Sequence, residues 1–174
     1  VFAKLAGHYG IVKDEEATAY LNKLGKSIGL YTERQELEYY FAILNTEQVN
    51  GYALPGGFIL ISLGALKMVD GPGELVGILS HELGHINIKH ILKSVKIEVK
   101  MNFFEILARF LAGPRQVVTS MVGEISSKIE ETLFMNGLSN SDEYEADVYA
   151  VNLMKGFNIS QQSYLNYLKR LSEN

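Results

Sequence analysis

Residues 74–92, which read ELVGILSHELGHINIKHIL, are the stretch on which the fold prediction rests. Apolar residues recur along this stretch at helical spacing, and Gly71, Pro72 and Gly73 separate it from the segment before it. Proline is tolerated in a first helical turn because the amide hydrogen that it lacks would have no helical partner there. The pattern therefore predicts one long helix over these residues.

The same stretch carries the pattern HELGH at residues 81–85. Side chains four residues apart lie on one face of a helix, so His81 and His85 can take two tetrahedral positions on one zinc ion. Glu82 follows His81 by about 100° around the helix, which lets its carboxylate reach a metal-bound water without becoming a ligand. Metal-assisted hydrolysis needs a general base in that position. The pattern predicts one catalytic zinc ion, with Glu82 as the general base.

A catalytic zinc ion needs a third protein ligand and an open fourth position. The chain has no cysteine, which excludes a thiolate ligand, a zinc finger, a disulfide and the site of peptide deformylase. The metzincin pattern would place its third histidine at position 91, where this chain has Ile91. His90 is one residue too early for that pattern, and we expect it to be a polar group at the helix end. Carboxylates remain, and DEYEAD at residues 142–147 opens a later predicted helix. An acidic helix start also compensates the helix dipole, so this cluster alone leaves the ligand open.

Three blocks of the chain resemble one family of zinc metallopeptidases, which includes the HtpX-like proteases, the CAAX prenyl endopeptidase and bacterial periplasmic relatives. The blocks are NGYALPGG at residues 50–57, HELGH with the following Lys89 and His90, and EYEAD at residues 143–147. The resemblance covers about residues 15–92 and 139–172 and leaves the residues between these ranges outside it. It also implies a location in the periplasm or cell envelope.

The resemblance implies a gluzincin-type site in which Glu143 is the third zinc ligand. Asp147 stands one helical turn later, and its shorter side chain suits hydrogen bonding to an imidazole ligand. Glu145 is turned by about 200° from Glu143 around the helix, so we expect it to stay outside the site. The residue that stabilises the oxyanion is left open, because a tyrosine or histidine from another element fits that role and the chain has ten tyrosines.

The block at residues 50–57 is expected to contribute to substrate binding. Its Pro-Gly-Gly sequence predicts a turn between two strands, and the resemblance implies that the strand after this turn borders the cleft. An extended peptide that pairs with such a strand is held through its main chain. The alternative is an ordinary hairpin turn. The expected substrate-binding residues are Asn50, Ala53, Leu54, Pro55, Gly56 and Gly57.

Apolar periodicity and turn residues predict a single α+β domain over residues 1–174, mostly helical and zincin-like, with a small sheet beside the HELGH helix. Ser139 and Asp142 predict a capping box before a later helix. A helical insertion at about residues 94–138 is expected to cover or gate the cleft. The strands are predicted at residues 37–44, 49–54 and 58–62, and the further helices at 14–28, 63–69, 91–112, 118–133, 142–155 and 161–171.

The composition of the chain argues against nucleic-acid binding and against a membrane-spanning segment. The formal net charge is −4, and the Lys and Arg residues are scattered along the chain, so we expect no nucleic-acid binding. The most apolar run, residues 101–112, carries Glu105 and Arg109 and is shorter than the ~20 residues that a membrane-spanning helix needs. We therefore expect no transmembrane segment in this chain. The sequence leaves the oligomeric state open.

These patterns predict a zinc-dependent endopeptidase that hydrolyses peptide bonds of protein substrates, among them misfolded or cell-envelope proteins. Zinc would polarise the scissile carbonyl, and Glu82 would take a proton from water and pass it to the leaving amine. One alternative is a chaperone-like, protein-binding module that keeps the zinc but cleaves little. Another is a structural zinc site, which would need four protein ligands and no open position.

Overall fold

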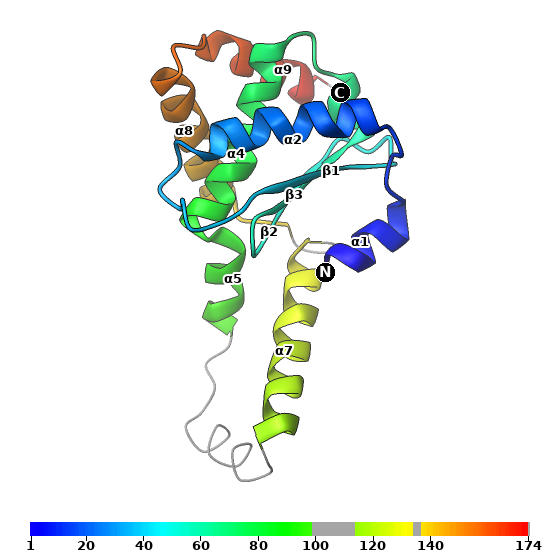
Figure 1. Ribbon diagram of the computed structural model, residues 1–174. Coiled ribbons are helices and arrows are strands. Elements are labelled where there is room, and N and C mark those ends of the chain that lie inside the picture. The colour runs from blue at the N-terminus through cyan, green and yellow to red at the C-terminus, as the bar shows by residue number, and fades with distance from the viewer. Residues whose placement is uncertain (99–113, 134–136, 174) are drawn as a thin grey trace.

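A small mixed sheet with helices around it forms the body of the computed structural model, which describes residues 1–98, 114–133 and 137–173 (Figure 1). The three strands are β1 (Tyr40–Leu44), β2 (Gly51–Leu54) and β3 (Phe58–Ser62), in the order β1-β3-β2. β1 runs parallel to β3, and β2 runs antiparallel to it. The predicted strands are confirmed, and among the described residues β2 is an edge strand with one side free.

The turn between β2 and β3 lies where the Pro-Gly-Gly sequence predicts it. Gly56 and Gly57 both have a φ angle of 91°, a conformation that residues with a Cβ rarely adopt. A Cβ on Gly57 would also collide with the carbonyl oxygen of Glu38. Both glycines are therefore explained by the backbone of the turn.

The helix that carries HELGH, α4 (Pro72–Ile88), is central and contacts α2 (Glu15–Gly29), α8 (Asn140–Gly156), α9 (Gln161–Ser172) and β2. It approaches α8 closely because Gly84 lies against Tyr149 and Ala146, and a Cβ on Gly84 would be 3.2 Å from the Cβ of Tyr149. Ala146 is fully buried in this contact. The packing of α4 on α8 and β2 is what positions the site.

The end of α4 differs from the prediction of a helix that continues to residue 92. The helix stops at Ile88, because Lys89 takes a left-handed conformation with a φ angle of 65°. A separate helix, α5 (His90–Glu98), begins directly afterwards. His90 therefore belongs to the first turn of α5 and not to α4.

The start of α8 carries the predicted capping box. The Ser139 hydroxyl accepts a hydrogen bond from the backbone amide of Asp142, whose carboxylate accepts one from the amide of Ser139. These bonds satisfy amides that have no partner within the helix. The cap fixes the first turn of α8, which contains Glu143.

Three further helices are α1 (Phe2–Tyr9), α3 (Leu63–Lys67) and α7 (Pro114–Glu131). The sequence pattern contains no signal for α1, which inserts Leu5 into a small core with Leu44, Tyr52 and Leu60. α5 and α7 lie side by side and extend from the body as an arm (Figure 1), joined by Ile91, Val95 and Ile129. None of the helices in the described ranges combines the length and apolar composition needed to cross a bilayer.

The described residues confirm a mostly helical α+β fold with a small sheet beside the HELGH helix. Part of the predicted insertion, residues 99–113 and 134–136, lies outside the described residues.

Candidate metal centre

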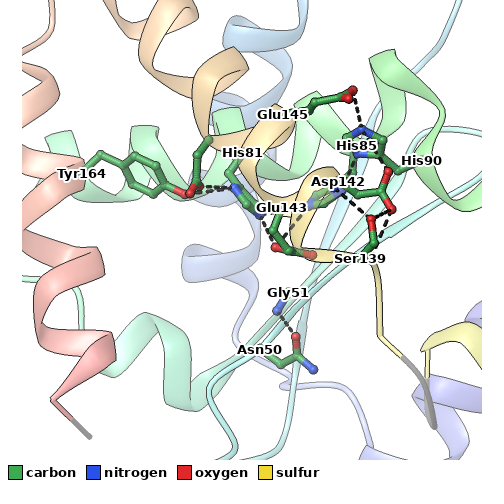
Figure 2. Close-up of polar contacts among 11 residues, drawn as sticks. Asn50, Gly51, His81, His85, His90, Ser139, Asp142, Glu143, Glu145 and Tyr164 are labelled. Carbon is green, nitrogen blue, oxygen red and sulfur yellow. Dashed lines mark hydrogen bonds and ion pairs between the residues drawn. The ribbon is translucent and has the colours of Figure 1, made fainter.

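The two histidines of HELGH and one glutamate of α8 meet at a single point. His81 and His85 lie one turn apart on α4, and their Nε2 atoms are 2.9 Å from each other. The Oε2 atom of Glu143 is 3.4 Å from Nε2 of His81 and 3.8 Å from Nε2 of His85. Figure 2 shows the three side chains converging from the two helices.

The spacing of these three atoms fits one metal ion. Two ligand atoms at about 2.0–2.2 Å from a tetrahedral zinc ion lie ~3.4 Å from each other. The observed separations of 2.9, 3.4 and 3.8 Å lie around that value. Two imidazoles and one carboxylate are also a donor set that suits a catalytic zinc ion and leaves a fourth position for water or substrate.

The second ring nitrogen of His81 is held by α8 and α9. Its Nδ1 atom is 2.8 Å from Oδ1 of Asp147, which also accepts a 2.8 Å hydrogen bond from the hydroxyl of Tyr164. Tyr164 is buried, and its hydroxyl lies 3.0 Å from the same His81 nitrogen. These contacts orient the imidazole so that Nε2 faces His85 and Glu143.

The second ring nitrogen of His85 contacts another histidine. Nδ1 of His85 is 2.9 Å from Nδ1 of His90, a residue with no solvent exposure. Nε2 of His90 is 3.4 Å from Oε2 of Glu145 and 3.7 Å from Oδ1 of Asp142. The structure corrects the prediction of His90 as a polar group at the end of the active helix, since α4 ends before it and its ring is buried against His85.

An open cleft lies over the cluster, with a volume of about 300 Å³. The general-base candidate Glu82 is buried at its floor, and its carboxylate lies against the backbone of Gly51 in β2. The lining combines the edge of β2 with residues from α4, α8, α9 and the end of the arm. It includes Val49, Asn50, Ala53, Ile78, Leu133, Leu138, Tyr167, Leu168 and Leu171.

Comparison with known proteins agrees with this geometry, since the model of peptidase family M48 matches residues 12–168. The chain belongs to peptidase family M48. This M48 chain is 20% identical to the beta-barrel assembly-enhancing protease of Yersinia pestis, over 94% of its own length and 34% of that protein. It is 27% identical to the metalloprotease YcaL of Escherichia coli (strain K12), over 87% of its own length and 58% of that protein.

Another relative, the mitochondrial metalloendopeptidase OMA1 of Bos taurus, is 25% identical over 68% of the M48 chain and 23% of that protein. The M48 chain spans about a third of the length of the assembly-enhancing proteases that it matches. The family is one of peptidases, and three of the relatives are named as metalloproteases or a metalloendopeptidase. The family also implies a metal ion, and His81, His85 and Glu143 are the described residues that fit one.

The electrostatics of the M48 site separate its two histidines when no metal is bound. Burial opposes a charge on His81, but hydrogen bonds to Asp147 and Glu143 outweigh it and raise the pKa of this imidazole to about 10. Burial and the neighbouring charge of His81 lower the pKa of His85 to about 3. A proton in the metal-free site is therefore held by His81.

The pKa values of the two carboxyl groups, Glu82 and Glu143, are also shifted in opposite directions. Burial raises the pKa of Glu82 to about 7, with His81 opposing and Glu143 adding to the shift. The hydrogen bond from His81 lowers the pKa of Glu143, although burial opposes this. Glu82 can therefore both accept and return a proton near neutral pH, whereas Glu143 stays ionised.

The predicted substrate-binding residues of the M48 chain separate into two groups. Asn50 and Ala53 line the cleft, so the strand that borders it is β2, before the Pro-Gly-Gly turn, and not the expected strand after the turn, which is the central strand of the sheet. The others lie away from it, because Leu54 is buried in the small core with Leu5 and residues 55–57 form the turn between β2 and β3. A part of Pro55, Gly56 and Gly57 in substrate binding therefore stays a prediction.

Tyr164 and His90 contact the site although the sequence patterns do not assign them to it. Nothing around Tyr164 distinguishes it from the other nine tyrosines, and only the packing of α9 on α4 brings it to His81. The basic residue and histidine after HELGH mark His90, but its contact with His85 depends on the left-handed Lys89.

Proposed function

We propose that the chain is a zinc-dependent endopeptidase that cleaves protein substrates, with proteins of the cell envelope as the substrate class. The observation that carries this proposal is the convergence of His81, His85 and Glu143 beside the buried carboxylate of Glu82, at the floor of an open cleft. In the proposal, the three residues hold zinc and Glu82 is the general base.

Each residue has one task in this proposal. When bound, zinc supplies Lewis-acid chemistry that polarises the scissile carbonyl and favours attack by water at neutral pH. Glu82 removes a proton from the attacking water and passes it to the leaving amine. In the metal-free site, burial raises the pKa of this carboxyl to about 7, close to the neutral pH at which a general base works best. Asp147 and Tyr164 hold the His81 ring in place through its Nδ1 atom, so that Nε2 remains available for the metal.

The free edge of β2 supports a mode of substrate binding. An edge strand presents unpaired backbone amides and carbonyls, and an extended peptide can pair with them as an additional strand. Residues 49–53 border the cleft along this edge, and Gly51 lies against Glu82. A peptide paired there would pass over the general base with little demand on its own sequence.

The other walls of the cleft favour apolar side chains in the substrate. Ile78 of α4 and Tyr167, Leu168 and Leu171 of α9 line one part, and Leu133 and Leu138 line another. Apolar residues are exposed in unfolded or unassembled proteins and buried in folded ones. This lining supports unfolded or unassembled proteins as substrates.

The envelope part of the proposal rests on the relatives. Four of them are named beta-barrel assembly-enhancing proteases, and such a name connects those proteins with barrel assembly. We also propose a periplasmic or cell-envelope location for this chain. The same three sequence blocks support its place in the branch with the HtpX-like and CAAX prenyl proteases. The intact Glu82 argues against the chaperone-like alternative.

Digestion of an unfolded protein, such as reduced casein, tests the proposal. The zinc-loaded chain should release peptides, and a chelator should stop it until zinc is restored. A chain that binds casein and holds zinc but yields no peptides would instead support the chaperone-like alternative. Substrates are identified by comparing envelope proteins that accumulate in cells expressing Glu82→Gln with those expressing the unchanged chain.

A further inference from the structure

The surroundings of the two histidine ligands are not equivalent. His81 is oriented by a carboxylate, that of Asp147 at 2.8 Å. His85 is oriented by another imidazole, that of His90, with 2.9 Å between the two Nδ1 atoms. His90 has no solvent exposure, and the left-handed Lys89 turns the chain so that the ring faces back toward α4.

The hydrogen positions in this pair follow from the metal assignment of the proposed function. A neutral imidazole carries one hydrogen, and a metal on Nε2 of His85 requires that this hydrogen be on Nδ1. At 2.9 Å, Nδ1 of His85 then donates to Nδ1 of His90, which has to accept. A neutral His90 therefore carries its own hydrogen on Nε2.

That second hydrogen also has an acceptor. Nε2 of His90 lies 3.4 Å from Oε2 of Glu145, within hydrogen-bond distance, and 3.7 Å from Oδ1 of Asp142, whose charge also faces the ring (Figure 2). The donors thus run in one direction, from His85 to His90 and from His90 to Glu145. Each of the two imidazoles therefore has a neighbour that fixes which of its nitrogens carries the hydrogen.

Burial explains why an imidazole stands between His85 and the carboxylates. The His85 side chain is only 5% exposed, and an ionised carboxylate placed directly behind it would lose most of its hydration. The Glu145 side chain is instead 51% exposed, so its charge remains in water. Through its two ring nitrogens, His90 links His85 to Glu145, so the carboxylate influences the buried imidazole while it remains in contact with water.

We propose that His90 is a positioning residue for His85: it accepts the Nδ1 hydrogen of His85, leaves Nε2 free for the metal, and is itself oriented by Glu145 and Asp142. The proposal rests on zinc binding as stated in the proposed function. It extends the site to Glu145, which the helix geometry alone leaves outside it.

Two substitutions separate this role from simple filling of space. The carboxamide oxygen of His90→Asn can stand near the place of Nδ1 and accept the same hydrogen, although it cannot reach Glu145. The side chain of His90→Leu fills a similar volume and accepts nothing. Loss of a partner that orients a metal ligand typically weakens metal binding by about 10 to 100-fold.

The experiment is chelator-competition measurement of the zinc dissociation constant, with thermal unfolding of each metal-free variant as the check on folding. We expect His90→Leu to raise the dissociation constant by about 10 to 100-fold and His90→Asn by less than about tenfold. His8→Leu, the same replacement at an exposed histidine of α1, should leave it unchanged. A folded His90→Leu variant with unchanged zinc affinity would overturn the proposal.

A measurement on the unchanged chain keeps the test decisive even where His90→Leu does not fold. Nitrogen-15 NMR of the zinc-loaded chain should show His85 with its hydrogen on Nδ1 and His90 with its hydrogen on Nε2 only. A hydrogen on Nδ1 of His90 would contradict the proposed direction. A chain that binds no zinc would refute the proposed function and this inference together, whereas normal zinc binding with the wrong tautomer refutes the inference alone.

Discussion

The carboxylate of Glu82 lies directly against Gly51, so closely that a Cβ at position 51 would collide with Oε1 of the glutamate. This contact joins two blocks that are thirty residues apart in the sequence, the HELGH helix and the edge strand β2. A peptide paired with that edge would therefore reach the general base directly. This arrangement supports the proposed role of Glu82 as the general base.

We predict that Glu82→Gln keeps zinc but loses most peptide hydrolysis. The amide has nearly the shape of the carboxylate but cannot accept a proton, and loss of a general base typically costs ~10² to 10⁴ in rate. Metal analysis and a peptide-cleavage assay on the same sample measure both properties. Glu16→Gln, at an exposed position of α2, is the matched control and should behave as the unchanged chain. Full activity in Glu82→Gln would refute the general-base assignment.

Zinc binding should release a proton at neutral pH. The metal-free His81 has a pKa of about 10, above the ordinary value of 6.5, so it keeps its proton until the pH rises through about 10. Zinc has to displace that proton, so its apparent affinity should increase by about tenfold per pH unit across the neutral range. Calorimetry in buffers with different enthalpies of protonation gives the number of protons released.

The hydrogen bond to Asp147 is a main cause of this raised pKa, which supplies the control. Asp147→Asn removes the negative charge and should reduce the number of protons released on zinc binding at pH 7. Equal proton release by both forms, or none by the unchanged chain, would contradict the charge state assigned to His81.

The carboxylates of α8 should differ in their effect on zinc. Glu143→Ala should abolish high-affinity binding, because it removes a proposed ligand, and Asp147→Ala should weaken binding by about 10 to 100-fold. Glu145→Ala should weaken it by less than about tenfold, since Asp142 also faces His90. Titration of zinc into each metal-free variant gives the order. Loss of zinc in Glu145→Ala with retention in Glu143→Ala would show that the third ligand is misassigned.

Local signals in the sequence predicted much of the fold. The capping box of Ser139 and Asp142 marks the start of α8 because both partners lie within one turn, and the Pro-Gly-Gly turn separates β2 from β3. The long helix with HELGH follows from its own periodicity. Each of these features depends on interactions between residues close in the chain, which is why the pattern is sufficient.

The parts that the sequence did not predict depend on packing. Lys89 ends α4 in a left-handed conformation that a glycine would have signalled. Without that signal the sequence pattern continues through residue 89, which is why it predicts His90 at the end of the same helix. Tyr164 reaches His81 only because α9 folds back on α4. The short α1 carries no capping side chain and is held by the burial of Leu5. None of these three features is marked by a pattern of residues close to it in the sequence.

The base of the arm should limit the size of the substrate that enters the cleft. Leu133 and Leu138 line the cleft at that base and also pack against the cluster of Ile91, Val95 and Ile129 that joins α5 to α7. Truncation of both leucines would widen the entrance without touching the proposed ligands. We predict that the double variant Leu133→Ala with Leu138→Ala raises kcat/KM more for an unfolded protein than for a short peptide.

Loosening of the arm itself has to be separated from widening of the entrance, and Leu92→Ala provides that control. Leu92 packs against the same cluster but does not line the cleft, so its truncation loosens the arm and leaves the entrance unchanged. It should therefore leave the ratio of the two kcat/KM values as in the unchanged chain. If the double variant loses activity on both substrates equally, or changes the ratio no more than Leu92→Ala does, then the base of the arm does not restrict entry and the covering role predicted for the insertion is wrong.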